Sequence, residues 1–129
     1  MIYEGVHKRL GVPIVFDSHH FECGPQDSSY EEAIGMAVET WPTGITPQCH
    51  HSNSRKNYEN SAVAKSAHSD WYYEPFNSCG HTLDVVLEAK MKERALIKYK
   101  KDFCKFSKTR YICSTRASRC TKRNTCNTK

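Results

Sequence analysis

Three short apolar runs, at residues 12–17, 45–50 and 82–88, dominate the hydrophobic pattern of this chain. Each run contains β-branched residues and is followed by polar or turn-forming positions. The runs are also shorter than a typical helix. This pattern predicts three strands.

Helical signals lie before, between and after these strands. They predict helices over residues 1–10, 29–39 and 89–99. The second is the best defined, because Ser29 and Glu32 have the spacing of a capping box and a Trp-Pro-Thr-Gly sequence follows the last turn. The remaining polar stretches, residues 21–29 and 52–69, are predicted to be irregular, with at most a short helix around residues 69–73.

The alternation of helices and strands predicts an α/β fold with parallel strands and right-handed crossovers. Side chains alternate between the two faces of a strand, so Glu88 shares a face with Asp84. By the same parity His50 points inward and His51 points the other way. Parity does not decide between His19 and His20, because the chain is leaving the first strand there.

Carboxylates and histidines gather where the predicted strands end. Asp17 closes the first run, with His20 three residues later, His50 closes the second, and Glu88 closes the third. Active sites of α/β barrels are built at the carboxyl ends of the strands. Carboxylate oxygen and imidazole nitrogen from separate strands suit Mn, Zn or Fe. The sequence therefore predicts a site at this edge, with Glu88 as its most informative member.

Charge divides the chain into an acidic body and a basic end. Residues 1–97 hold 8 Lys and Arg against 13 Asp and Glu, whereas residues 98–129 hold 11 Lys and Arg against Asp102 alone. We expect one domain over residues 1–100 and a basic, cysteine-containing, disordered tail over residues 101–129. Within the tail a short packed segment could include Tyr111 and Ile112. The tail is either a solvated end or a segment that contacts nucleic-acid phosphates.

The seven cysteines contain no Cys-x-x-Cys pair, so no zinc-ribbon or redox signature is present. Charged residues interrupt the start of the chain, and no run approaches the roughly 18 apolar residues of a membrane span. These features predict an intracellular setting with reduced thiols and no membrane contact. They do not separate the nucleus from the cytoplasm.

Four motifs occur in the order seen in UV damage endonucleases: VPIVFDSHH at residues 12–20, TPQCHHS at 46–52, AHSDW at 67–71 and DVVLEAKMKE at 84–93. Over about residues 5–100 the chain resembles the carboxyl-terminal part of such an enzyme. The resemblance implies about three strands of a TIM (β/α)8 barrel related to endonuclease IV. It also implies nicking of DNA on the 5′ side of ultraviolet photoproducts, in excision repair, by a cluster of metal ions usually described as manganese.

The resemblance assigns the metal ligands residue by residue. Asp17 and His20 match an Asp-x-x-His pair, His50 and His68 match two further histidine ligands, and Glu88 matches a metal-bridging carboxylate with a catalytic role. The family usually has a catalytic-site lysine two residues before the second-strand histidine, where this chain has Gln48. Glutamine carries neither the charge of lysine nor its modification chemistry.

The family's other ligands, and the residues that probe the lesion, lie on earlier strands. The resemblance therefore implies an incomplete multi-metal site, inactive in this chain alone, with damaged double-stranded DNA and a separate amino-terminal half as partners. Two alternatives stay open. One is another metal-dependent TIM barrel, endonuclease IV-like or sugar isomerase-like, and the other is an inactive remnant that binds nucleic acid.

Overall fold

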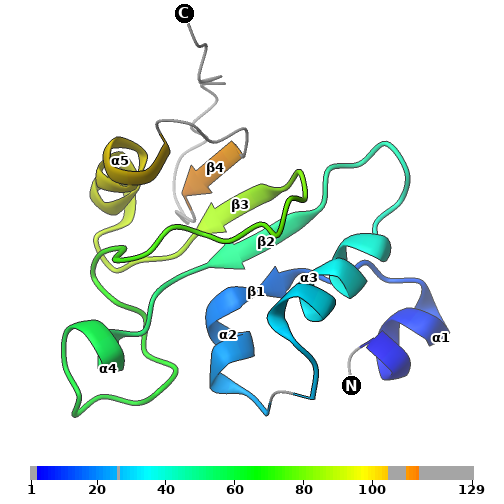
Figure 1. The fold of residues 1–129 in the computed structure, drawn as a ribbon, viewed down its shortest axis with the longest axis horizontal. Coiled ribbons are helices and arrows are strands. Elements are labelled where there is room, and N and C mark those ends of the chain that lie inside the picture. The colour runs from blue at the N-terminus through cyan, green and yellow to red at the C-terminus, as the bar shows by residue number, and fades with distance from the viewer. Residues whose placement is uncertain (1–2, 26, 105–109, 114–129) are drawn as a thin grey trace, which may run out of the picture.

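A parallel sheet with strand order β1-β2-β3-β4 forms the centre of the protein in the computed structural model, which describes residues 3–25, 27–104 and 110–113 (Figure 1). The strands are Phe16–Asp17 (β1), Gln48–His51 (β2), Asp84–Leu87 (β3) and Arg110–Cys113 (β4). All three neighbouring pairs are parallel. The predicted α/β class and parallel strands are therefore confirmed, whereas closure into a barrel stays a prediction.

Helices precede the sheet and connect its strands. They are a π-helical turn at Tyr3–His7, then α1 (Lys8–Leu10), α2 (Ser18–Cys23), α3 (Tyr30–Glu39), α4 (Arg55–Tyr58) and α5 (Lys92–Phe103). Gly11 ends α1 with φ of 65°, a left-handed conformation that glycine adopts without strain. Within the described residues, no helix has the length and apolar composition needed to cross a membrane.

The capping box predicted for α3 is present. The Ser29 hydroxyl accepts the backbone N–H of Glu32 at 3.2 Å, and the Glu32 carboxylate accepts the backbone N–H of Ser29 at 2.8 Å. Two donors that a helix start leaves unsatisfied are thus paired. The apolar face of α3 buries Ile34 and Ala37 in the core, and this contact fixes the helix beside β1.

The core lies on one face of the sheet, against α3 and α5. Val85 and Leu87 of β3 are 0% and 1% exposed, while Asp84 and Val86 between them are half-buried, as the predicted parity requires. From α5, Tyr99 is fully buried, and its hydroxyl accepts the backbone N–H of Phe76 at 2.8 Å. The other face of the sheet carries Gln48, His50 and Asp84 together with Val86.

The first strand is shorter than predicted, because β1 covers only Phe16–Asp17 of the apolar run 12–17. The backbone N–H of Ile14 donates to the Thr40 hydroxyl, and its carbonyl accepts from the Trp41 indole, both at 2.8 Å. The end of α3 therefore takes the backbone groups that would otherwise extend a ladder.

The structure differs from the sequence predictions over three short segments. Residues 18–23 form α2, although residues 21–29 were predicted to be a loop, because the Asp17 carboxylate caps a helix start there. Residues 69–73 form no helix. The Glu59 carboxylate accepts the backbone N–H groups of Asp70 and Trp71, where the chain bends instead of forming a helix. The predicted irregular stretch 52–69 also contains the short helix α4.

The sheet has four described strands, where the sequence predicted about three. The fourth, β4, lies inside the stretch 101–129 that was predicted to be a tail, and it pairs with β3 in the register Asp84↔Arg110. The helix α5 likewise continues past residue 100 to Phe103. Ordered secondary structure therefore crosses the predicted boundary. The rest of the predicted tail, residues 105–109 and 114–129, lies outside the described residues.

Candidate metal centre

Three neighbouring strands bring Asp17, His50 and Glu88 together at the carboxyl edge of the sheet. Asp17 lies opposite His50 in the β1–β2 register. Glu88 follows β3 directly, and its backbone N–H donates to the carbonyl of His51 at 2.9 Å. One ligand atom from each of the three side chains lies within 4.8 Å of the others. The edge thus has the geometry of a candidate metal site.

Two carboxylates face one imidazole in this cluster. His50 Nδ1 lies 3.1 Å from Glu88 Oε1 and 4.0 Å from Asp17 Oδ2. All three side chains are half-buried, at 33%, 25% and 20% exposed for His50, Glu88 and Asp17. The three side chains are therefore partly covered by protein and partly open to solvent. Two oxygens and one nitrogen suit a divalent cation such as Mn²⁺ or Zn²⁺.

His20 and His68 extend the cluster on the side of α2. His68 Nδ1 lies 3.7 Å from Glu88 Oε2, and His20 Nε2 lies 4.0 Å from Asp17 Oδ2. The rings of His20 and His68 are 5.8 Å apart. Glu88 therefore turns one carboxylate oxygen to His50 and the other to His68, which is the arrangement that a carboxylate bridging two ions needs.

Asp17 combines a structural and a candidate ligand role. Its Oδ1 accepts the backbone N–H of His20 at 2.9 Å and so caps α2. Its Oδ2 faces His20 and His50. Capping of α2 therefore uses one oxygen of Asp17 and leaves the other directed at the cluster.

The structure also separates the adjacent histidine pairs. His19 is 1% exposed, and its ring lies 5.2 Å from the ring of His68. Burial lowers the pKa of His19, and the nearby charge of His68 lowers it further. His20, at 58% side-chain exposure, reaches the open side of the cluster. Strand parity did not decide whether His19 or His20 faces the site. In the structure His20 is the one that faces Asp17.

His51 points into the core, as predicted. Its ring accepts from the Ser18 hydroxyl at 2.9 Å and donates to the Glu74 carbonyl at 3.3 Å, and a single neutral tautomer satisfies both bonds. Burial lowers the pKa of His51 to about 4. The residue is therefore a neutral support behind the site rather than a ligand.

A segment without helix or strand carries His68, and hydrogen bonds to its backbone hold it in place. The Glu59 carboxylate accepts the N–H groups of Asp70 at 2.7 Å and Trp71 at 3.3 Å, and the hydroxyl of Tyr73 at 2.9 Å. The carbonyl of Ser69 accepts the N–H of Lys90 at 3.0 Å. Sequence reasoning missed Glu59, because no spacing or motif marks a carboxylate that binds backbone N–H groups of a distant segment.

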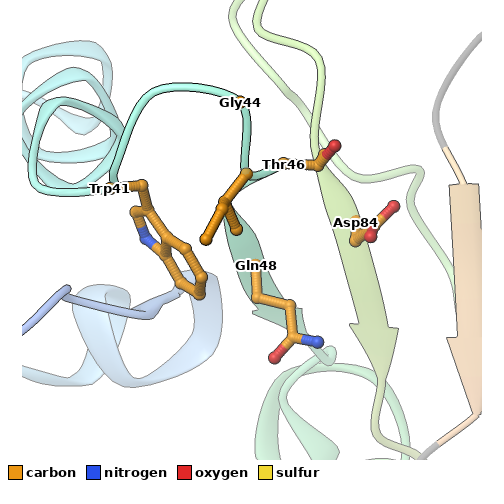
Figure 2. A pocket seen from close by; sticks show the side chains of 6 residues that line it. Trp41, Gly44, Thr46, Gln48 and Asp84 are labelled. Atoms are coloured by element: carbon orange, nitrogen blue, oxygen red, sulfur yellow. The ribbon is translucent and has the colours of Figure 1, made fainter.

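Gln48 lies on the same face of β2 as His50, one step nearer the start of the strand. It pairs with Asp84 in the β2–β3 register and lines a shallow groove of about 440 Å³ with Trp41 and Thr46 (Figure 2). Figure 2 shows the Gln48 amide on the strand face below the loop that carries Thr46. Position 48, where the resemblance led us to expect a lysine, thus belongs to the same strand face as the cluster.

A parallel α/β sheet with carboxylates and histidines converging at its carboxyl edge defines a candidate metal-binding α/β protein. Comparison with known families narrows this class. The family model described as "UV-endonuclease UvdE" matches residues 5–118, and the chain belongs to that family. The resemblance drawn from the four motifs is thereby confirmed.

Individual relatives support the same family membership. The chain is 31% identical to a UV DNA damage endonuclease of Bacillus pumilus over 104 residues, which are 73% of this chain and 31% of that protein. A UV-damage endonuclease of Schizosaccharomyces pombe is 35% identical over 95 residues, 69% of this chain and 16% of that protein. The chain therefore spans less than a third of the curated relatives it matches. No solved structure matches the chain.

Proposed function

We propose that this chain supplies the carboxyl-terminal metal ligands of a UV damage endonuclease, which nicks double-stranded DNA on the 5′ side of ultraviolet photoproducts. The observation that carries the proposal is the convergence of Asp17, His50 and Glu88 from three strands within 4.8 Å. Membership of the UvdE family supports it, as do the names of the relatives. The alternatives of a sugar isomerase-like or endonuclease IV-like enzyme are not favoured by these matches.

The donor set fits divalent ions. Asp17, His50 and Glu88 would hold one ion, and Glu88 with His68 and His20 would hold part of a second, with Mn²⁺ as the proposed ion. Such ions, when bound, activate water and neutralise charge on the phosphate oxygens. Because the chain spans less than a third of its relatives, further ligands would come from residues outside this sequence, in the proposed amino-terminal half.

The protein's own residues would contribute position and charge. The cap on α2 and the backbone bond from Glu88 to His51 fix the two carboxylates before any ion binds. Such preorganised charge makes the largest single contribution to transition-state stabilisation in many enzymes. The half-buried cluster is screened less by salt than an exposed one.

A chimera tests this proposal. Residues 5–118 of this chain would replace the matching segment of the Bacillus pumilus relative, so that the remaining part of a family protein is present. With Mn²⁺ we expect nicks 5′ to photoproducts in irradiated duplex. We expect no nicks after chelation with EDTA, in unirradiated duplex, or with the Glu88→Gln variant.

A folded chimera that binds Mn²⁺ but never nicks irradiated DNA would contradict the proposal, provided that the parent protein does so under the same conditions. Cleavage of abasic duplex without photoproduct cleavage would instead favour the endonuclease IV-like alternative. Circular dichroism of chimera and parent serves as the folding control.

A further inference from the structure

Charge is unequally distributed on the two sides of the candidate metal centre. Residues 3–88 hold 5 Lys and Arg against 12 Asp and Glu, whereas residues 90–104 hold 6 Lys and Arg against 2 Asp and Glu. In Figure 1 α5 lies near the β4 edge of the sheet, and α1, α2 and α3 lie near the β1 edge. Since Glu88 precedes α5, the metal centre lies at the border between an acidic and a basic side.

The basic side contains a groove along the outer face of α5. Arg94, Lys98 and Lys101 are spaced by four and three residues and so share one helix face. They line a groove of about 510 Å³ together with Ile97, Trp71 and Asp102. Ile97 is 68% exposed, while the opposite face of α5 buries Ala95 and Tyr99. The helix is thus amphipathic, and the groove lies on the side that the core does not use.

Backbone hydrogen bonds join this groove to the metal centre. The N–H of Lys90 donates to the carbonyl of Ser69 at 3.0 Å, and the N–H of Met91 donates to that of Asp70 at 3.2 Å. Trp71 follows these residues and stands three positions after His68. The groove therefore begins where the segment that carries His68 meets the start of α5.

We propose that this groove, lined by Trp71, Arg94, Ile97, Lys98 and Lys101, binds the phosphate backbone of duplex DNA beside the phosphodiester bond presented to the metal centre. The proposal rests on the proposed endonuclease function and names the face over which the duplex leaves the site. Charge complementarity favours this occupant, because DNA offers a regular row of negative charges. Approach over the acidic side would meet repulsion.

The spacing of the cations fits this occupant. Seven residues of helix separate Arg94 from Lys101, or about 10 Å, which covers two to three successive phosphates of one strand at roughly 3.4 Å of axial rise each. The ion pair between Lys98 and Asp102 is exposed and contributes little to stability. A phosphate can therefore replace the carboxylate at small cost.

Salt-dependent binding of an undamaged, fluorescently labelled duplex tests the proposal, measured with EDTA present so that cleavage plays no part. The groove variant is Arg94→Gln/Lys98→Gln/Lys101→Gln in the full 129-residue chain. The matched control Lys8→Gln/Arg9→Gln/Lys56→Gln removes the same charge at exposed sites on α1 and α4. Both variants keep residues 105–129, so the basic end of the chain does not distinguish them.

We expect the slope of log Kobs against log salt to become shallower by about 2 to 3 in the groove variant, because each phosphate contact contributes about 0.9. The control variant should change it by less than about 1. The charge-retaining variant Arg94→Lys/Lys98→Arg/Lys101→Arg should restore the slope of the native chain. In the native chain, bound duplex should protect Lys98 and Lys101 from acetylation but leave Lys8 and Lys56 reactive.

Equal weakening in the groove and control variants would overturn the proposal, and so would equal protection of all four lysines or the absence of duplex binding by the native chain. Binding of a polyglutamate peptide that is lost only in the groove variant, with duplex affinity unchanged, would also overturn it and assign the groove to an acidic protein. None of these results depends on nicking. The chimera tests the proposed endonuclease function separately, so failure of one proposal can be told apart from failure of the other.

Discussion

At the residue scale, the two oxygens of each carboxylate in the candidate metal centre face different partners. Asp17 uses one oxygen to cap α2 and directs the other at His50, and Glu88 turns its two oxygens toward His50 and His68. The positions of Asp17, His50 and Glu88 were predictable, because strand parity and the ends of apolar runs specify both face and edge. The role of Glu59 was not, since it depends on a contact between segments 11 residues apart in the sequence.

Gln48 gives the first prediction. A lysine there would place a positive charge on the inner face that leads to His50, where it could stabilise negative charge on the phosphate. We expect Gln48→Lys in the chimera to raise the rate of nicking, by up to about 100-fold on the scale of single charge-stabilising groups. Mn²⁺ affinity should stay unchanged, as Gln48 is not a member of the ligand cluster.

The control for this prediction is Gln48→Met, which keeps the length of the side chain but adds no charge. Nicking that is equal in the Lys and Met variants would show that a charge at position 48 has no part in the reaction.

At the element scale, short segments between strands position the histidines. The helix α2 presents His20, and the segment after α4 presents His68, which pairs with Ser54 in an isolated bridge. Periodicity predicted α3 and α5, which have amphipathic patterns long enough to read. It could not predict α2, because a helix of six residues is too short to show a period. It could not predict the path of residues 68–74, because that path depends on hydrogen bonds to Glu59.

Glu59 gives the second prediction. Removing its carboxylate leaves the part-buried N–H groups of Asp70 and Trp71 without this acceptor, and water can replace it in part, so the loss is about 1–3 kcal/mol for the pair. We expect Glu59→Ala to lower the free energy of unfolding by an amount of this order and to weaken Mn²⁺ binding through the displaced His68. Amide hydrogen exchange at residues 70 and 71 and Mn²⁺ titration measure the two effects.

Glu31→Ala provides the comparison, because Glu31 is an exposed carboxylate on α3, away from the cluster. If residues 70 and 71 exchange no faster in the Glu59 variant than in the Glu31 variant, Glu59 does not hold the segment.

At the scale of the whole molecule, β1 and β4 are the two edge strands of the sheet within the described residues. The strand β4 covers the outer edge of β3, whereas β1 has β2 as its neighbour in the sheet. Leu10, Val12 and Val15, which precede or flank β1, are 72%, 48% and 41% exposed. The sequence predicted three strands but not β4, because four residues after a polar stretch show too short a pattern to identify a strand.

Exposed apolar residues beside an open strand edge promote association. We therefore expect the isolated chain to self-associate at micromolar concentration and Val12→Lys/Val15→Lys to reduce that association, as measured by sedimentation velocity. Ile97→Lys, on the far side at α5, is the matched substitution and should have a smaller effect. A monodisperse native monomer with cooperative thermal unfolding would contradict this expectation.

Titration of the full chain with Mn²⁺, followed by the electron paramagnetic resonance signal of the free ion, tests the central claim most directly. The account predicts saturable binding by the native chain and by Glu31→Gln. It predicts that Glu88→Gln binds Mn²⁺ at least 10- to 100-fold more weakly. Loss of a residue that only orients a metal ligand lowers metal affinity by about this factor, and loss of a ligand itself should lower it at least as much. Equal affinity in the native and Glu88→Gln chains, or no saturable binding by the native chain, would contradict the assignment of this edge as a metal centre.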